Sequence, residues 1–306
     1  MASFFDEINK NKMKSILLMI IFGLLFAGVV YLVDIIFGGG LIGLVAGLAL
    51  IVIYALFVYS LGDKFVLKVS KAKPADKSQY KDLYDIVDEV ATGLQIQPPP
   101  KIYIINDQNP NAFATGKNKK SASIAVTTGL LSMMNHEELE GVISHEMSHI
   151  YNNDIQFMLI ATVFAGIIGL IAAIFRSMLF FGGFGMGGRG SRNGGDSTLI
   201  LLVLAVVIGI FAALFATLLK LAISRRREYM ADANGARITR APKYLASALK
   251  KIQAYENNPT AQPVKNANEI TASLYFANPL KRKSIMNLFS THPPIEDRIK
   301  KLEEMY

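Results

Sequence analysis

The chain contains no cysteine, few charged residues and only 4 histidines. The absence of cysteine excludes disulfide bonds, thiolate metal sites and a cysteine nucleophile. Charged residues make up 18% of the 306 positions, whereas hydrophobic residues make up 52%. This balance is unlike that of an ordinary soluble domain and favours a membrane protein. Because histidine is scarce, a motif built from a histidine pair carries more weight here than in an average chain.

Long stretches of the chain lack charge altogether. Each of four such apolar runs approaches or exceeds the roughly 20 residues that a helix needs to cross a bilayer. These runs are Ser15–Val33, Leu41–Leu61, Gln156–Phe175 and Leu199–Leu219. Core helices rarely stay apolar on every face over this length. The first run is too long for a signal-peptide core and has no small-residue cleavage site after it, so we expect a retained anchor. The sequence therefore predicts four transmembrane helices.

The net charge of +8 is concentrated near the ends of the predicted spans, at positions such as Lys14, Lys64 and Arg225. Lysine and arginine at these places meet anionic lipid headgroups and orient the spans. The loop between the first two spans has neither residue. We therefore expect both termini and both polar regions in the cytoplasm. Because no basic stretch is interleaved with aromatic residues, we expect no nucleic-acid partner.

The predicted spans divide the chain into four parts. Residues 1–63 form a first transmembrane hairpin, and residues 64–155 form a cytoplasmic catalytic part. Residues 156–219 form a second hairpin with a glycine-rich outer loop at 182–196, and residues 220–306 form a cytoplasmic C-terminal part.

The catalytic part contains His145-Glu146-Met147-Ser148-His149, the pattern H-E-x-x-H, in a segment with helical character. Residues four apart share one face of a helix, so His145 and His149 can direct both imidazoles at a single ion. Glu146 lies one position further round and is placed to take a proton from a water bound to that ion. The pattern predicts zinc and hydrolysis of an amide bond.

A catalytic zinc site needs a third protein ligand. Two predicted spans separate His149 from the C-terminal part, so the chain returns to the same side of the membrane. There Glu228 and Asp232 lie four residues apart in a helical continuation of the last span. One carboxylate could bind the metal while the other orients a ligating histidine. The residues alone leave open which does which, and also allow solvated carboxylates paired with the adjacent arginines.

These motifs resemble those of the HtpX family of membrane zinc metalloproteases, which are relatives of the CAAX prenyl protease. The resemblance covers nearly the whole chain, through HEMSH, the tandem spans, SRRREYMADA, Asn111–Ala114 and Ser290–Pro294. It implies one Zn²⁺ per chain, with Glu228 as third ligand and Asp232 as its supporting residue. It also implies a multi-pass protein of the bacterial inner membrane that cleaves misfolded or damaged membrane proteins in stress-related quality control.

The resemblance also implies residues that act on the substrate. Asn111 is expected to contact it. His292 and Arg298 are spaced like a histidine–arginine pair in the prenyl-protease relatives that is linked to substrate or transition-state stabilisation. Without the resemblance, His292 would be a surface histidine and Arg298 an ordinary helix charge. Tyr229, beside Glu228, is another candidate for this role.

The polar parts predict a mainly helical zincin-type domain with a small β-sheet, which makes the whole chain an α+β membrane protein. We expect a helix over Ser78–Gln95, a strand over Lys101–Asn106, paired strands over Asn111–Gly116 and Ser121–Thr127, and a cap at Asn135 for the metal-binding helix. Asn111–Ala114 or Ser121–Thr127 would be an edge strand that pairs with an extended substrate, unless that strand is purely structural.

We therefore expect an integral-membrane zinc endopeptidase. One alternative is a CAAX-type prenyl-protein protease, although that family encloses a large chamber with more than four spans. The other is a non-enzymatic metal-binding membrane scaffold or transporter. Transporters usually carry charged residues or broken helices within the membrane, and a scaffold has no use for Glu146. The sequence does not predict the oligomeric state.

Overall fold

The computed structural model describes residues 40–156, 158–159, 225–258, 274–277 and 293–305, together with isolated positions between 13 and 31. Several predicted features lie outside the described residues. They are most of the first and third spans, the whole of the fourth span, the glycine-rich loop and His292. Within the described part, no helix is assigned as long and apolar enough to cross a membrane. The prediction of four spans is therefore unconfirmed.

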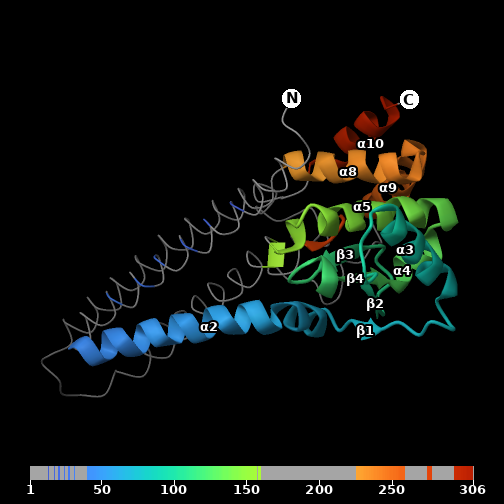
Figure 1. The fold of residues 1–306 in the computed structure, drawn as a ribbon. Helices are drawn as coiled ribbons and strands as arrows, with labels where there is room; N and C mark the ends of the chain where they lie inside the picture. Colours follow the sequence, from blue (N-terminus) through green and yellow to red (C-terminus); the bar gives the residue numbers. More distant parts are fainter. Residues whose placement is uncertain are drawn as a thin grey trace, which may run out of the picture.

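The second predicted span lies within helix α2 (Gly40–Val69), which leads away from the other described elements (Figure 1). The helix continues through the boundary predicted at residue 63. Several of its apolar side chains are exposed, including Leu41 at 76% and Ile42 at 84%. Its last turns differ, because Val66 and Leu67 are buried in an apolar cluster with residues of the sheet.

The sheet has four strands: β1 (Lys73–Pro74), β2 (Lys101–Ile105), β3 (Ala112–Thr115) and β4 (Ser123–Thr127). Their order is β1-β2-β4-β3, in which β2 and β4 run parallel while the other two pairs are antiparallel. The predicted strand and strand pair are confirmed. Since β4 lies inside the sheet, the suggestion that Ser121–Thr127 is an edge strand is wrong. Strand β3 is the edge strand of that pair.

Six further α-helices are described. They are α3 (Lys81–Gly93), α4 (Thr128–Met133), α5 (His136–Tyr151), α8 (Arg225–Thr239), α9 (Pro242–Asn257) and α10 (Ile295–Glu303). Helix α5 packs on β3, α3, α8 and α9. Helices α8, α9 and α10 lie beyond α5, on the side away from the sheet (Figure 1). This places the H-E-x-x-H helix at the centre of the described domain.

The start of α5 has the cap that the sequence predicts. The Asn135 side chain accepts a hydrogen bond from the Glu138 backbone N–H at 2.8 Å, and the Glu138 carboxylate accepts one from the Asn135 N–H at 3.0 Å. This reciprocal capping box satisfies two backbone donors that the first turn otherwise leaves unpaired. It fixes where α5 begins, and hence which residues face the other helices.

Apolar side chains cover both faces of the sheet. On β3 and β4, Ala112, Ala114, Ile124 and Val126 join the main core with α5. The alternate residues, including Phe113, join a second cluster with the end of α2. This period of two is what a strand buried on both faces requires. The sheet is thus held rigidly beside α5.

Candidate active site

The close approach of α8 to α5 brings the two halves of the candidate site together. At Gly235 in α8, an added Cβ atom would lie 3.2 Å from the backbone nitrogen of His145 in α5. A side chain at this position would require the backbone of α5 to shift by a few tenths of an ångström, so glycine suits this close contact. The same helix α8 carries Glu228 in its first turn and Asp232 one turn later. Glu228 is therefore held against both histidines, and Asp232 against His145.

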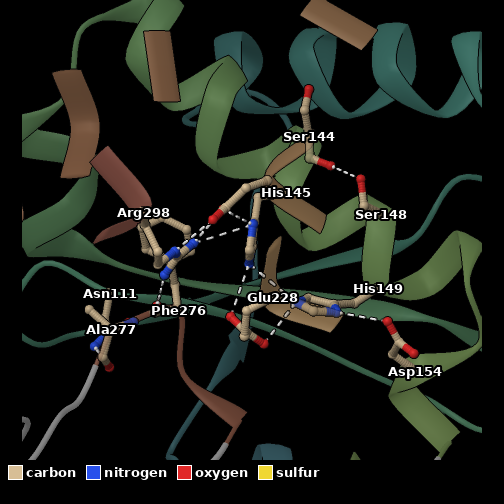
Figure 2. Close-up of polar contacts among 11 residues, drawn as sticks. Asn111, Ser144, His145, Ser148, His149, Asp154, Glu228, Phe276, Ala277 and Arg298 are labelled. Atoms are coloured by element: carbon tan, nitrogen blue, oxygen red, sulfur yellow. Dashed lines mark hydrogen bonds and ion pairs between the residues drawn. The ribbon is translucent and has the colours of Figure 1, made fainter. Parts of the chain in front are cut away.

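Three buried side chains converge on one point in Figure 2. The Nε2 atoms of His145 and His149 lie 3.2 Å apart, and the Glu228 carboxylate oxygens lie 3.7 Å and 3.5 Å from them. Zinc bonds of about 2.0–2.1 Å in a tetrahedron put neighbouring ligand atoms roughly 3.4 Å apart. The separations therefore fit one zinc ion, with the fourth position left for water or substrate.

The second ring nitrogen of each histidine faces an aspartate. His145 Nδ1 lies 2.9 Å from Asp232 Oδ1, and His149 Nδ1 lies 3.1 Å from Asp154 Oδ2. A carboxylate on Nδ1 fixes the tautomer that leaves Nε2 free to bind a metal. Asp232 was expected in this role, whereas Asp154 was missed. The only sequence signal for Asp154 was an acidic residue just past the end of the metal-binding helix.

Arg298 lies behind His145, beside Asp232. Its Nε and Nη2 atoms donate to the two Asp232 oxygens at 2.9 and 2.7 Å, and Nη1 donates to the Phe276 carbonyl at 3.1 Å. Nη2 also approaches His145 Nδ1 at 3.4 Å. These contacts make Arg298 a support for the Asp232 carboxylate. Its role in transition-state stabilisation stays a prediction.

Asn111 bonds a neighbouring segment of the chain. Its side-chain amide donates to the Ala277 carbonyl at 2.9 Å and accepts from the Ala277 N–H at 3.1 Å. The Phe276 N–H donates to the carbonyl of Ala112 on β3 at 2.8 Å, and the Phe276 ring packs edge-on against His145 at 4.9 Å between centroids. Part of the β3 edge is therefore paired internally, and substrate contact by Asn111 stays a prediction.

Glu146 is buried beside the three converging side chains, with 2% of its surface exposed. Burial raises the pKa of its carboxyl to about 7, although the charge on His149 and the Ala114 N–H oppose this shift. A general base works best when its pKa lies near the pH of the reaction. The environment of Glu146 therefore suits proton exchange near neutrality.

The two histidines have opposite electrostatic surroundings. Burial lowers the pKa of His145 to about 4. Burial also disfavours charge on His149, but its hydrogen bond to Asp154 and the carboxylates of Glu228 and Asp154 outweigh this and raise its pKa to about 9. A divalent cation at Nε2 favours the neutral imidazole in both cases. The carboxylates that stabilise a charged His149 are equally suited to stabilise that cation.

Two other residues, His292 and Tyr229, were predicted to act on the substrate or the transition state. His292 lies outside the described residues. Tyr229 is partly buried, and the Nζ atom of Lys301 lies 3.3 Å from the centroid of its ring.

Comparisons with known proteins show the family of this chain. The sequence model of peptidase family M48 matches residues 77–306. A protease HtpX homolog from Caldanaerobacter subterraneus subsp. tengcongensis is 42% identical, over 97% of this chain and 96% of the relative. A homolog of the same name from Dictyoglomus thermophilum is 40% identical, over 99% of this chain and 95% of its own length. One from Lactobacillus helveticus is 37% identical, over 98% and 99%.

A solved structure shows a weaker similarity. It is the crystal structure of S. mikatae Ste24p, which is 20% identical to this chain with a TM-score of 0.49. The match covers 96% of this chain and 67% of that one.

Proposed function

Because the chain belongs to peptidase family M48, among its HtpX-type metalloproteases, we propose that it is an integral-membrane zinc endopeptidase that cleaves misfolded or damaged membrane proteins. One observation carries this proposal. The Nε2 atoms of His145 and His149 and the carboxylate of Glu228 form a buried triangle of the size that a zinc ion requires, and Glu146 lies beside it.

His145, His149 and Glu228 would hold the zinc. When bound, zinc supplies a Lewis acid that polarises the peptide carbonyl and lowers the pKa of water to about 7. Glu146 accepts a proton from the attacking water and then delivers it to the amine that leaves. Asp232 and Asp154 keep both imidazoles in the tautomer with a free Nε2.

The edge of β3 would hold the substrate backbone. An extended peptide adds to an exposed strand edge through main-chain hydrogen bonds, which tolerate many sequences. Phe276 and Ala277 already bond the Ala112 carbonyl and the Asn111 amide. A substrate that pairs along all of β3 would displace the backbone of Phe276 and Ala277 from these contacts. Broad sequence tolerance suits an enzyme that removes damaged proteins.

The membrane location rests on the sequence and on α2. Four long runs lack charge, and α2 exposes apolar side chains such as Leu41 and Ile42 over much of its length. A bilayer would cover such a surface. We place the protein in the bacterial inner membrane as a multi-pass protein. The zinc site is placed on the cytoplasmic side, where lysine and arginine near the predicted spans are most numerous.

The test compares wild type with Glu146→Gln, both purified in detergent. The substrates are an unfolded membrane protein and a prenylated peptide with a CAAX-type tail. We expect the wild type to cleave the unfolded protein in a chelator-sensitive reaction. Glu146→Gln keeps the size of the side chain but cannot act as the base, so kcat should fall by at least about 100-fold while bound zinc, measured by metal analysis, is unchanged.

Three outcomes would count against the proposal. Substantial cleavage by Glu146→Gln would remove Glu146 as the base, and cleavage that survives complete metal removal would remove the zinc mechanism. Preference for the prenylated peptide would favour the prenyl-protease alternative instead.

A further inference from the structure

Two aspartates support the zinc-binding histidines, and only the one beside His145 was expected. We propose that Asp154 and Arg227 form a second support, which positions His149 as Asp232 and Arg298 position His145. Both are positioning residues, because they act on the metal through the imidazole. This inference rests on the proposed zinc-dependent function and adds to it a connection between His149 and the two chain segments that flank residues 156–219.

A left-handed turn brings Asp154 to His149. Helix α5 ends at Tyr151, and Asn153 then has a φ of +59°. Asparagine is among the few residues that adopt this conformation readily. The turn lets the Asp154 side chain reach the Nδ1 atom of a histidine only five residues earlier, at 3.1 Å. Figure 2 shows Asp154 on the side of His149 opposite Glu228.

Asp154 is itself held by an arginine from the other half of the site. It is 1% exposed, and a carboxylate buried to this degree needs compensating charge. Arg227, 8% exposed, places its Nη1 atom 3.8 Å from Asp154 Oδ1. Arg227 directly precedes Glu228. The first turn of α8 therefore supplies the zinc ligand Glu228 and also the guanidinium that holds Asp154 beside His149. A shift of α8 would move both together.

The two supports differ in geometry, and the difference predicts how each tolerates lysine. Arg298 binds Asp232 through two nitrogens, at 2.7 and 2.9 Å, which a lysine cannot reproduce. Arg227 Nη1 lies 3.8 Å from Asp154 Oδ1, an ion-pair separation at which charge matters more than the two-pronged shape of the guanidinium. Arg227→Lys should therefore keep most of the zinc affinity, whereas Arg298→Lys should lose much of it.

The experiment measures metal binding independently of catalysis. Full-length Asp154→Ala, Asp154→Asn, Arg227→Gln, Arg227→Lys and Arg298→Lys are compared with Asp85→Asn, a control at an exposed aspartate of α3. Zinc affinity is measured by chelator competition, and ligand geometry by the visible absorption of the cobalt(II)-substituted protein. Circular dichroism of the metal-free variants reports folding, and Asp154→Asn serves if Asp154→Ala does not fold.

We expect Asp154→Ala to weaken zinc binding by roughly 10- to 100-fold and to alter the cobalt spectrum. Asp154→Asn should fall in between, because it keeps a hydrogen-bond acceptor but loses the charge. With saturating zinc, kcat should fall while KM stays within about twofold. Zinc affinity and cobalt spectra equal to those of Asp85→Asn in both Asp154 variants would overturn the inference. A wild type that binds no zinc would instead overturn the proposed function.

Discussion

At the scale of single residues, the backbone of Asn153 decides whether Asp154 reaches His149. A β-branched residue at a φ of +59° is strained by about 1–3 kcal/mol, whereas glycine adopts this conformation freely. We expect Asn153→Val to lower the free energy of unfolding by that amount and to weaken zinc binding. Asn153→Gly should change both by much less. Chemical denaturation and chelator competition on the two variants test this, and equal behaviour of valine and glycine would contradict it.

The site residues differ in how far the sequence could reveal them. His145 and His149 lie four residues apart in one helix, so their spacing alone predicts a shared face with Glu146 one position further round. For Glu228 and Asp232 the spacing left the roles open, and the family resemblance chose between them. Asp154 reaches His149 only through the unusual turn at Asn153, which hydrophobic patterning does not show. Its contact with Arg227 depends on how α8 packs against α5, and no local pattern encodes that.

At the scale of helices, the cap of α5 links stability to pH through Glu138. Its carboxylate accepts hydrogen bonds from Lys251 Nζ at 2.5 Å and from Ser247 Oγ at 2.7 Å. Burial opposes the charge, but these bonds and the Asn135 N–H lower the pKa of Glu138 below 4.5. The charged form therefore stabilises the fold above about pH 4.5, and this contribution disappears as the pH falls through the lowered pKa.

Glu138→Gln keeps the capping hydrogen bond but removes the charge. We expect it to cost roughly 1 kcal/mol at pH 7, because Lys251 is partly exposed and solvent screens the pair. The difference from wild type should shrink as the pH falls below 4.5 and through the lowered pKa of Glu138. Denaturation curves across this range measure it, with Glu137→Gln as an exposed control one residue earlier. A difference that does not vary with pH would show that the charge of Glu138 adds nothing.

The contact between α5 and α9 depends on a glycine. A Cβ atom at Gly141 would lie 2.8 Å from the backbone nitrogen of Leu245, and backbone atoms cannot move aside as a flexible side chain can. We expect Gly141→Ala to lower the free energy of unfolding by about 1–3 kcal/mol. Gly93, at the end of α3, has no atom within 4 Å of its added Cβ, so Gly93→Ala should be neutral or slightly stabilising. Thermal unfolding of both variants compares the two positions, and equal losses would contradict the packing argument.

The sheet shows both what patterning reveals and what it leaves open. The β-branched run of β2 and the pair formed by β3 and β4 were predictable, because strand propensity and alternation are local properties. The order β1-β2-β4-β3 was not, since it puts β4 between two strands that precede it in the sequence. The short strand β1 was missed, because a Lys-Pro pair has no strand signal. Long-range pairing thus decides which strand has the free edge.

At the scale of the whole molecule, the apolar surface of α2 leads to a test of the proposed membrane location. Leu41, Ile42 and Ile53 expose 76%, 84% and 62% of their surfaces, on a helix whose run from Leu41 to Leu61 has no charge. Soluble monomers rarely expose contiguous apolar surface of this kind, because contact with water costs about 25 cal/mol per Å². We therefore expect the native chain to remain in the membrane pellet after washing with alkaline carbonate and to be released only by detergent.

A peripheral protein held by its basic residues would be released by high salt or carbonate, since salt screens charge but does not weaken apolar contacts with lipid. Recovery of the folded chain in the carbonate supernatant would contradict an integral-membrane enzyme, while the metal site could still be tested on the soluble protein.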